Sequence, residues 1–138
     1  LPYISPIVHI DNIPMLDGGL SDSIPVERAM SQGCEKCIVV LTRNKGYRKK
    51  KSYFPMPNFM YRKYPQLQET LRTRHDLYNQ QLDLVDQLEA DGKILVIRPI
   101  LPIEVDRIEK DAVKLDKLYN EGFECAQKAN IAEFIKAT

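Results

Sequence analysis

The stretch Leu16-Asp17-Gly18-Gly19-Leu20 decides how the first part of the chain is organised. An acid followed by two glycines predicts a sharp turn, because glycine adopts backbone angles that other residues avoid. Most Asp-Gly pairs mark ordinary turns, and that alternative stays open here. The two glycines also leave no side chain in the way of another backbone or of a ligand. The sequence therefore predicts that the carboxylate of Asp17 is held at a fixed point.

Two short strands are predicted before this stretch, and a helix is predicted after it. The apolar segments Ile7–Ile10 and Ile13–Leu16 are separated by Asp11-Asn12. Both of these residues tolerate positive φ, so the three segments predict a β-hairpin. The helix is expected over Ile24–Gln32, because Pro25 suits a first turn and Gly33 is expected to stop the helix.

The remainder of the chain alternates between buried strands and helices. Continuous apolar runs such as Cys37–Leu41 and Ile94–Ile97 suit strands that are covered on both faces, as in a parallel sheet. Helices are expected from Pro65 to the stop at Gly92, over residues 104–128, and as a short tail over 130–138. We therefore predict a single α/β domain, 1–138, with a layered, mainly parallel sheet flanked by helices.

Charge is unevenly distributed along the 138 residues. Nine of the twenty Lys and Arg residues lie between Lys36 and Gln68, and no Asp or Glu does. No apolar run approaches the ~20 residues of a membrane span, and no signal-peptide pattern is present. We expect a cytoplasmic protein. The first residue is Leu1 rather than Met, which suggests that the sequence starts inside a longer protein.

The segment 43–64 is predicted to be a long loop in which basic and aromatic residues alternate. Arg48, Lys49, Lys50 and Lys51 are expected to be exposed and mobile there. An anionic membrane surface or an active-site lid would suit them, and a plain solvated loop is the alternative. Nucleic acid is not expected, because the chain carries no nucleic-acid fold signature.

The three cysteines are Cys34, Cys37 and Cys125, a sparse set that favours a reducing compartment. Cys34 and Cys37 have the spacing of a redox pair or of half a zinc site, but neither His9 nor His75 supplies matching ligands. We predict packing residues, and expect neither a metal nor a cofactor. A role for His75 as a catalytic base is a weaker alternative.

Several segments in order resemble the C-terminal half of a patatin-like phospholipase, of a bacterial branch of that family. The resemblance begins with Leu16–Leu20 and the segment Ile24-Pro25-Val26, and it covers essentially the whole chain. Its later parts are Ile38–Arg43, Gly46-Tyr47-Arg48, Arg74, Tyr78-Asn79, Gly92-Lys93, Ile97-Arg98-Pro99, Leu118-Tyr119 and Gly122.

The resemblance implies a serine acyl hydrolase of lipid metabolism that uses a Ser-Asp dyad. Asp17 would be the base, with its pKa raised by burial, and Gly18 and Gly19 would let the nucleophile's backbone approach. The Gly-x-Ser-x-Gly turn that carries such a nucleophile is absent here, and Ser21 is a poor substitute. We therefore expect the nucleophile in an N-terminal half of the parent enzyme, and no activity in this chain alone.

Two other functions stay open. The fold could be a non-catalytic binding module whose working part is the basic loop. Alternatively, Cys34 and Cys37 could have a redox or metal role. A lipid or acyl-ester substrate is expected only in the hydrolase case.

Overall fold

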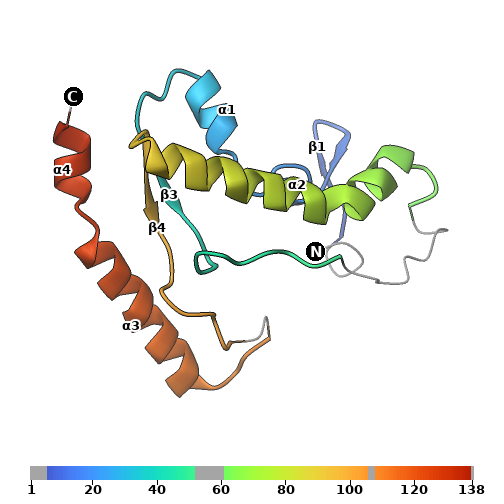
Figure 1. The fold of residues 1–138 in the computed structure, drawn as a ribbon. Coiled ribbons are helices and arrows are strands. Elements are labelled where there is room, and N and C mark those ends of the chain that lie inside the picture. Colours follow the sequence, from blue (N-terminus) through green and yellow to red (C-terminus); the bar gives the residue numbers. More distant parts are fainter. Residues whose placement is uncertain (1–5, 52–60, 106–107, 138) are drawn as a thin grey trace. The chain divides into compact units, whose positions relative to one another are not determined.

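The computed structural model describes residues 6–51, 61–105 and 108–137. Within them the chain forms four strands, four α-helices and one short 3-10 helix, in an order that begins with strands and ends with helices (Figure 1). Residues 52–60 of the predicted loop lie outside the described residues. The parts of that loop that are described, 43–51 and 61–64, contain no helix or strand, as predicted.

The first element is a β-hairpin. Strand β1 (Val8–Ile10) pairs antiparallel with β2 (Ile13–Met15), with Ile10 opposite Ile13. Asp11 and Asn12 adopt φ values of 50° and 63°, the left-handed conformation that a tight hairpin turn requires. The prediction made from these two residues is confirmed.

The middle of the chain forms a helix, a strand, a long helix and a second strand. Helix α1 (Val26–Ser31) precedes β3 (Cys37–Val40), and helix α2 (Pro65–Ala90) precedes β4 (Ile94–Ile97). Gly33 and Gly92, which follow the two helices, have φ values of 93° and 70°. This left-handed conformation ends a helix at low cost only in glycine, so both predicted stops are confirmed.

The sheet is smaller than predicted. Strands β3 and β4 are parallel, with Cys37 opposite Ile94, and the Leu41 amide donates to the Ile97 carbonyl at 2.8 Å. The described strands form only two separate two-stranded sheets, so the prediction of a layered, mainly parallel sheet is wrong beyond this pair. Val40 is 70% exposed, so β3 is not covered on both faces. The structure shows a mixed α/β fold with small sheets.

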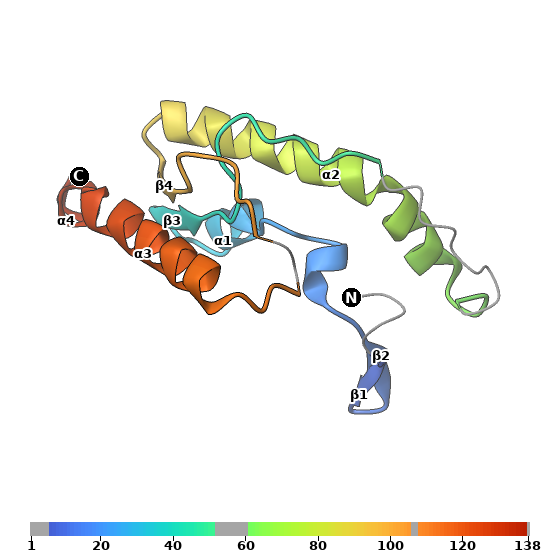
Figure 2. The same ribbon diagram turned by 90° about the horizontal axis from the view of Figure 1, so that it is seen from below.

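The last two helices are α3 (Ala112–Lys128) and α4 (Ile131–Lys136), drawn in orange-red and red in Figure 2. Helix α3 begins eight residues later than predicted, because the carboxylate of Asp111 accepts hydrogen bonds from the amides of Val113 and Lys114 and so caps the helix there. A glycine in the middle of a helix, such as Gly122 of α3, suggests close approach to a neighbouring element. Among the described residues, however, a Cβ atom at Gly122 would meet nothing within 4 Å, so the structure shows no such approach.

The chain divides into two compact units, which we describe separately. Of the described residues, the first unit contains 6–25, 49–51 and 61–83, and the second contains 26–48, 84–105 and 108–137. The prediction of a single domain is untested by this division and stays a prediction. Buried apolar side chains occur in both units: Leu20, Ile24, Tyr61 and Leu82 in the first, and Val26, Leu41, Val85, Leu88 and Ile94 in the second.

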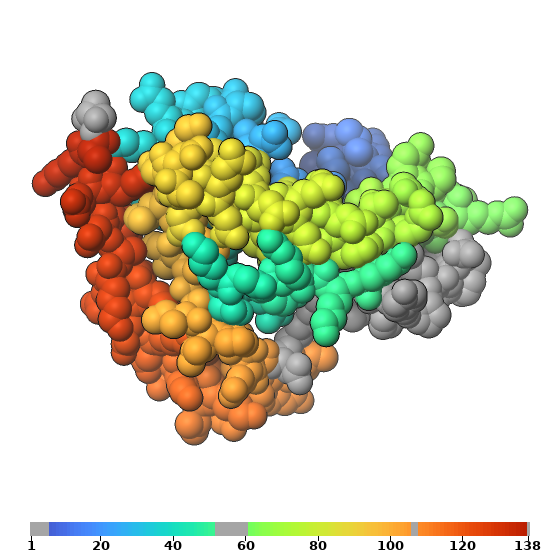
Figure 3. All heavy atoms as spheres, in the orientation of Figure 1, coloured from blue at the N-terminus to red at the C-terminus, as the bar shows by residue number. Residues whose placement is uncertain are grey.

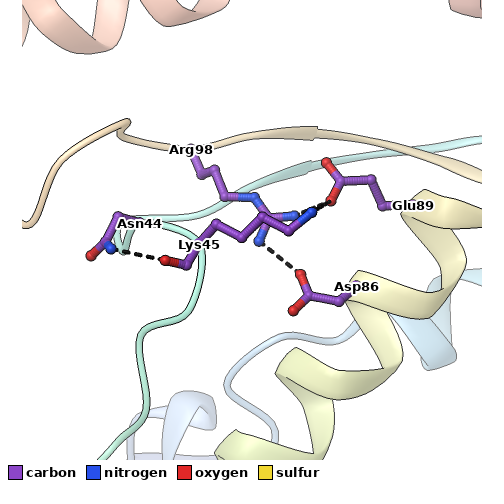
Figure 4. A network of polar contacts seen from close by, with 5 residues as sticks. All are labelled: Asn44, Lys45, Asp86, Glu89 and Arg98. Carbon is purple, nitrogen blue, oxygen red and sulfur yellow. Dashed lines mark hydrogen bonds and ion pairs between the residues drawn. The ribbon is translucent and has the colours of Figure 1, made fainter.

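A charged cluster joins β4 to α2 in the second unit. The guanidinium of Arg98, 10% exposed, donates to Asp86 at 2.9 Å and also pairs with Glu89 (Figure 4). Lys45, in the loop after β3, approaches the same Glu89 carboxylate at 3.5 Å. Because a mostly buried guanidinium needs paired acceptors, this cluster fixes the C-terminal end of β4 against the helix.

Candidate functional site

The predicted site residue Asp17 begins a short 3-10 helix, Gly18–Leu20. One carboxylate oxygen, Oδ1, accepts the Gly19 amide at 2.9 Å, and the Asp17 carbonyl accepts the Leu20 amide at 3.1 Å. Leu20 is buried, which anchors the turn. Asp17 itself is exposed, so the expectation of a buried carboxylate is wrong. Among the described residues, no donor is bonded to its second oxygen, Oδ2.

The two glycines differ in their surroundings. A Cβ atom at Gly19 would lie 3.2 Å from Oδ1 of Asp17, which is tighter than most such contacts. A Cβ atom at Gly18 would meet nothing within 4 Å. Among the described residues, the space at Gly18 is therefore open, whereas Gly19 is needed for the turn itself. Approach of another backbone at these glycines stays a prediction.

Helix α2 holds this turn through Arg74. The Nε of Arg74 donates to the Gly19 carbonyl at 3.0 Å, and the hydroxyl of Ser23 donates to the same oxygen at 2.7 Å. Arg74 interrupts the apolar stripe of α2 in the sequence, and that interruption was the available signal. A charged residue in an apolar stripe does not specify which distant backbone group it contacts, so this contact was not predicted.

A second contact comes from Gln81, two turns further along α2. Its Nε2 donates to Asp22 Oδ1 at 2.6 Å, and its Oε1 accepts the Ile24 amide at 3.2 Å. One side-chain amide thus joins both ends of a short backbone segment to the helix. Together with Arg74, it gives the segment 17–24 (the Asp17 segment) a fixed position on α2.

An apolar hollow of about 180 Å³ lies in the same unit. It is lined by Ile7, Pro14, Leu16, Tyr64 and Leu67. Leu16 directly precedes Asp17, so the chain passes from the wall of this hollow to the exposed carboxylate. The volume suits a small apolar group rather than a whole lipid chain.

No nucleophile is arranged next to Asp17 in the described residues. The hydroxyls of Ser21, Ser23 and Ser31 each donate to a backbone carbonyl close in sequence: Gly18, Gly19 and Arg28 respectively. The other two serines, Ser5 and Ser52, lie outside the described residues. His75 is paired with its neighbour Asp76 at 3.2 Å, and neither residue bonds to Asp17.

The basic residues predicted to face a surface are exposed in part. Arg48, Lys50 and Lys51 are exposed, whereas Lys49 is half-buried. The Lys49 amide donates to Asn79 Oδ1 at 2.8 Å, Asn79 donates back to the Lys49 carbonyl at 3.1 Å, and the Lys49 ammonium lies 5.0 Å from the centre of the Tyr78 ring. In Figure 3 the described end of this segment, coloured green, lies along the yellow-green helix α2. The backbone of Lys49 is therefore bonded to α2, and the mobility of the segment stays a prediction.

The cysteines are all free thiols. Cys34 is exposed, which contradicts the prediction that it is a packing residue, and Cys37 and Cys125 are half-buried. In the part of the chain that the structure describes, no group of three or more His, Cys, Asp or Glu residues could hold a metal ion. None of the described helices is long and apolar enough to cross a membrane.

Comparison with known families corrects the expected relationship. A family model described as a domain of unknown function, DUF6363, matches residues 64–136, more than half of the chain. The chain belongs to this family. The predicted membership of the patatin-like phospholipases is wrong, because the family that the chain matches is DUF6363. No curated protein and no solved structure matches the chain. The Asp17 segment precedes the matched region.

Proposed function

We propose that the Asp17 segment supplies the carboxylate of an acyl-ester hydrolase site whose serine nucleophile comes from residues outside this chain. The proposal rests on the geometry around Asp17, and the family relationship contributes nothing to it. The observation that carries it is an exposed Asp17 side chain in which one oxygen accepts a hydrogen bond from its own turn, at Gly19, while the other accepts none from the described residues.

The fixed turn supports this role because a general base must be positioned before it can act. The Gly19 amide orients Oδ1, and the contacts of Arg74 and Gln81 hold the following backbone on a helix. A serine hydroxyl is a weak nucleophile until a base within hydrogen-bond distance takes its proton. Oδ2 is the oxygen available for that proton, and Gly18 leaves room for the incoming backbone.

The experiment uses the complete polypeptide that contains residues 1–138 and measures ester hydrolysis and labelling by a fluorophosphonate. Asp17→Asn should lower turnover by at least ~10²-fold, the usual lower contribution of a positioned base. The turn should survive, because the Asn oxygen can still accept the Gly19 amide. The 138-residue chain alone should be neither active nor labelled.

Asp22→Asn is the matched control. Asp22 is five residues away and bonds to Gln81 through an oxygen that Asn retains, so this variant should keep its turnover. The proposal fails if the complete polypeptide does not hydrolyse esters, or if Asp22→Asn and not Asp17→Asn abolishes hydrolysis. If the fluorophosphonate labels the 138-residue chain alone, the nucleophile lies within this chain, with Ser21 as the first candidate. That result would contradict a nucleophile outside the chain.

The second candidate function is binding to an anionic membrane surface through Lys50 and Lys51. Asn79 fixes the backbone of the adjacent Lys49 on α2, so the two exposed lysines extend from an anchored segment. Each basic residue near an anionic surface contributes about 1 kcal/mol, screened by salt.

Vesicle sedimentation tests this second function. Replacing Lys50 and Lys51 by Gln should weaken binding to anionic vesicles by about tenfold or more, and high salt should do the same. The same change at Lys114 and Lys117 of α3 is the control and should have little effect. Equal binding of the unmodified chain to neutral and anionic vesicles would exclude the function.

A further inference from the structure

Cys34 and Cys37 lie in the short connection between α1 and β3. After Gly33 the chain bends at Glu35 and Lys36 and enters β3 at Cys37. The Cys34 amide donates to the Ala29 carbonyl at 3.2 Å, which fixes the first cysteine against the end of α1. A bend between two cysteines shortens the distance between their Cα atoms, as a disulfide requires.

The two thiols also interact with each other. Burial raises the pKa of Cys37, and the negative charge of the Cys34 thiolate and a side-chain hydrogen bond with Cys34 raise it further. Cys34 is exposed and Cys37 is half-buried. A small thiol reagent can therefore reach Cys34 from solvent more readily than it can reach Cys37.

Lys36, one of the two residues between the cysteines, holds the end of α4. The ammonium of Lys36 donates to the carbonyls of Phe134 at 2.8 Å and Ile135 at 3.1 Å, and to that of Ala137. It also lies 5.5 Å from the centre of the Phe134 ring. The last carbonyls of a helix have no partner within it and favour a cation, so Lys36 caps α4.

We propose that Cys34 and Cys37 are a thiol–disulfide exchange site for small disulfides such as oxidised glutathione, and that oxidation weakens the cap that Lys36 places on α4. The second part follows from the position of Lys36 inside the ring that the new bond closes. A disulfide constrains the backbone of the two residues that it encloses, and the cap depends on that backbone.

The exchange proceeds in two steps. The Cys34 thiolate attacks one sulfur of oxidised glutathione, forms a mixed disulfide and releases one glutathione thiolate, which takes up a proton. The Cys37 thiolate then attacks the Cys34 sulfur, closes the intramolecular disulfide and releases the second glutathione. The protein loses two protons and two electrons, and glutathione disulfide gains them as two thiols.

The position of the pair predicts its pH dependence. It precedes a strand rather than a helix, so no helix N-terminus stabilises a thiolate. Because the pKa of Cys37 is raised, the thiolate that closes the disulfide becomes more abundant as pH rises. Closure should therefore be slow near neutral pH and should accelerate in alkaline solution.

The test incubates the full chain with oxidised glutathione, blocks remaining thiols by alkylation and maps peptides by mass spectrometry. The unmodified chain and Cys125→Ser should contain a Cys34–Cys37 disulfide, reversed by excess reduced glutathione. Cys34→Ser and Cys37→Ser should stop at a mixed disulfide. Absence of the linked peptide, or pairing of either residue with Cys125 instead, would overturn the proposal.

Hydrogen exchange tests the coupling to α4. Oxidation should accelerate amide exchange in residues 131–137 by about two- to fivefold, the effect expected from losing a cation at a helix end. Lys36→Ala should produce the same acceleration in the reduced protein. If the disulfide forms while exchange in α4 is unchanged, the link between the cysteines and α4 is wrong.

Discussion

Helices α2 and α3 differ in what their apolar residues contact. Helix α2 buries Leu82, Val85 and Leu88, whereas α3 buries no residue at all. Yet α3 is the more strongly amphipathic of the two in sequence. Amphipathic spacing therefore predicts that a segment forms a helix, but it does not show which helix supplies the core.

The two helices also use their polar residues differently. Polar side chains of α2 bond to distant backbone, as Arg74 and Gln81 do at the Asp17 segment. Those of α3 bond to neighbours one turn away, as Lys128 does to Glu124. The contacts of α2 should cost more to lose, because they are partly buried and water replaces a lost hydrogen bond less readily there than at the exposed Lys128–Glu124 pair.

The largest difference should appear when the same substitution is made in both helices. Val85 is fully buried, and Val85→Ala removes two methyl groups and leaves a cavity, at a cost of about 2 kcal/mol in the free energy of unfolding. Val113 of α3 is 78% exposed, so Val113→Ala should change it by less than ~0.5 kcal/mol. Urea denaturation measures both. Equal losses would mean that α3 packs in solution as α2 does.

Adjacent glutamines of α2 allow a smaller comparison. Gln81→Ala removes the partner of both the Asp22 carboxylate and the Ile24 amide, and should cost about 1.5 kcal/mol. Gln80 is exposed, so Gln80→Ala should be nearly neutral. Urea denaturation measures the free energy of unfolding of both variants. An unchanged value for Gln81→Ala would show that the contact contributes nothing to stability.

Two arginines of α2 give a still smaller effect. Arg74→Met removes the donor to the Gly19 carbonyl and should cost about 1 kcal/mol, because Ser23 still donates to that oxygen. Arg72 is exposed, and among the described residues it pairs with Glu69 one turn away, so Arg72→Met should lower the stability less than Arg74→Met does. Thermal denaturation measures the loss of stability in each variant. A larger loss in Arg72→Met than in Arg74→Met would contradict the role of Arg74 in holding the Asp17 segment.

The smallest effect is expected at the start of α3. The amides of Asp111 and Lys110 donate to Glu109 and lower the pKa of its carboxyl from the ordinary value of 4.5. A lowered pKa means that the ionised form stabilises this turn above pH 4.5, and that the stabilisation is lost as pH falls through the lowered value. The amide chemical shifts of Lys110 and Asp111, the two donors to Glu109, should therefore change in acid, and Glu109→Gln should reduce that change. An identical acid response in the variant would refute this origin.

Local features of the fold were predictable from the sequence. Asp11-Asn12 gave the hairpin, and Gly33 and Gly92 gave two helix ends, because each depends on backbone angles set by the residue itself. The cap at Asp111 was missed, although an Asp two residues before the apolar Val113 was an available signal. The size of the parallel sheet was overestimated, because an apolar run predicts a strand but not how many other strands pair with it.

The candidate site was predictable only in part. The two glycines after Asp17 predicted a sharp turn, and in the structure Asp17 caps the short 3-10 helix that forms this turn. Its exposure was not predicted, since burial depends on residues far away in sequence. The contacts of Arg74 and Gln81 join positions more than fifty residues apart, and no local pattern specifies such pairs.

The central claim is that α2 holds the Asp17 segment in one arrangement, which the proposed function requires. The most direct measurement is amide hydrogen exchange at Ile24, whose N–H donates to Gln81 Oε1. We predict that this amide is protected in the unmodified chain and in Gln80→Ala, and that Gln81→Ala accelerates its exchange by about tenfold, while amides at the centre of α2 keep their rates. If Ile24 exchanges as fast in the unmodified chain as in Gln81→Ala, α2 does not hold the segment and the account is wrong.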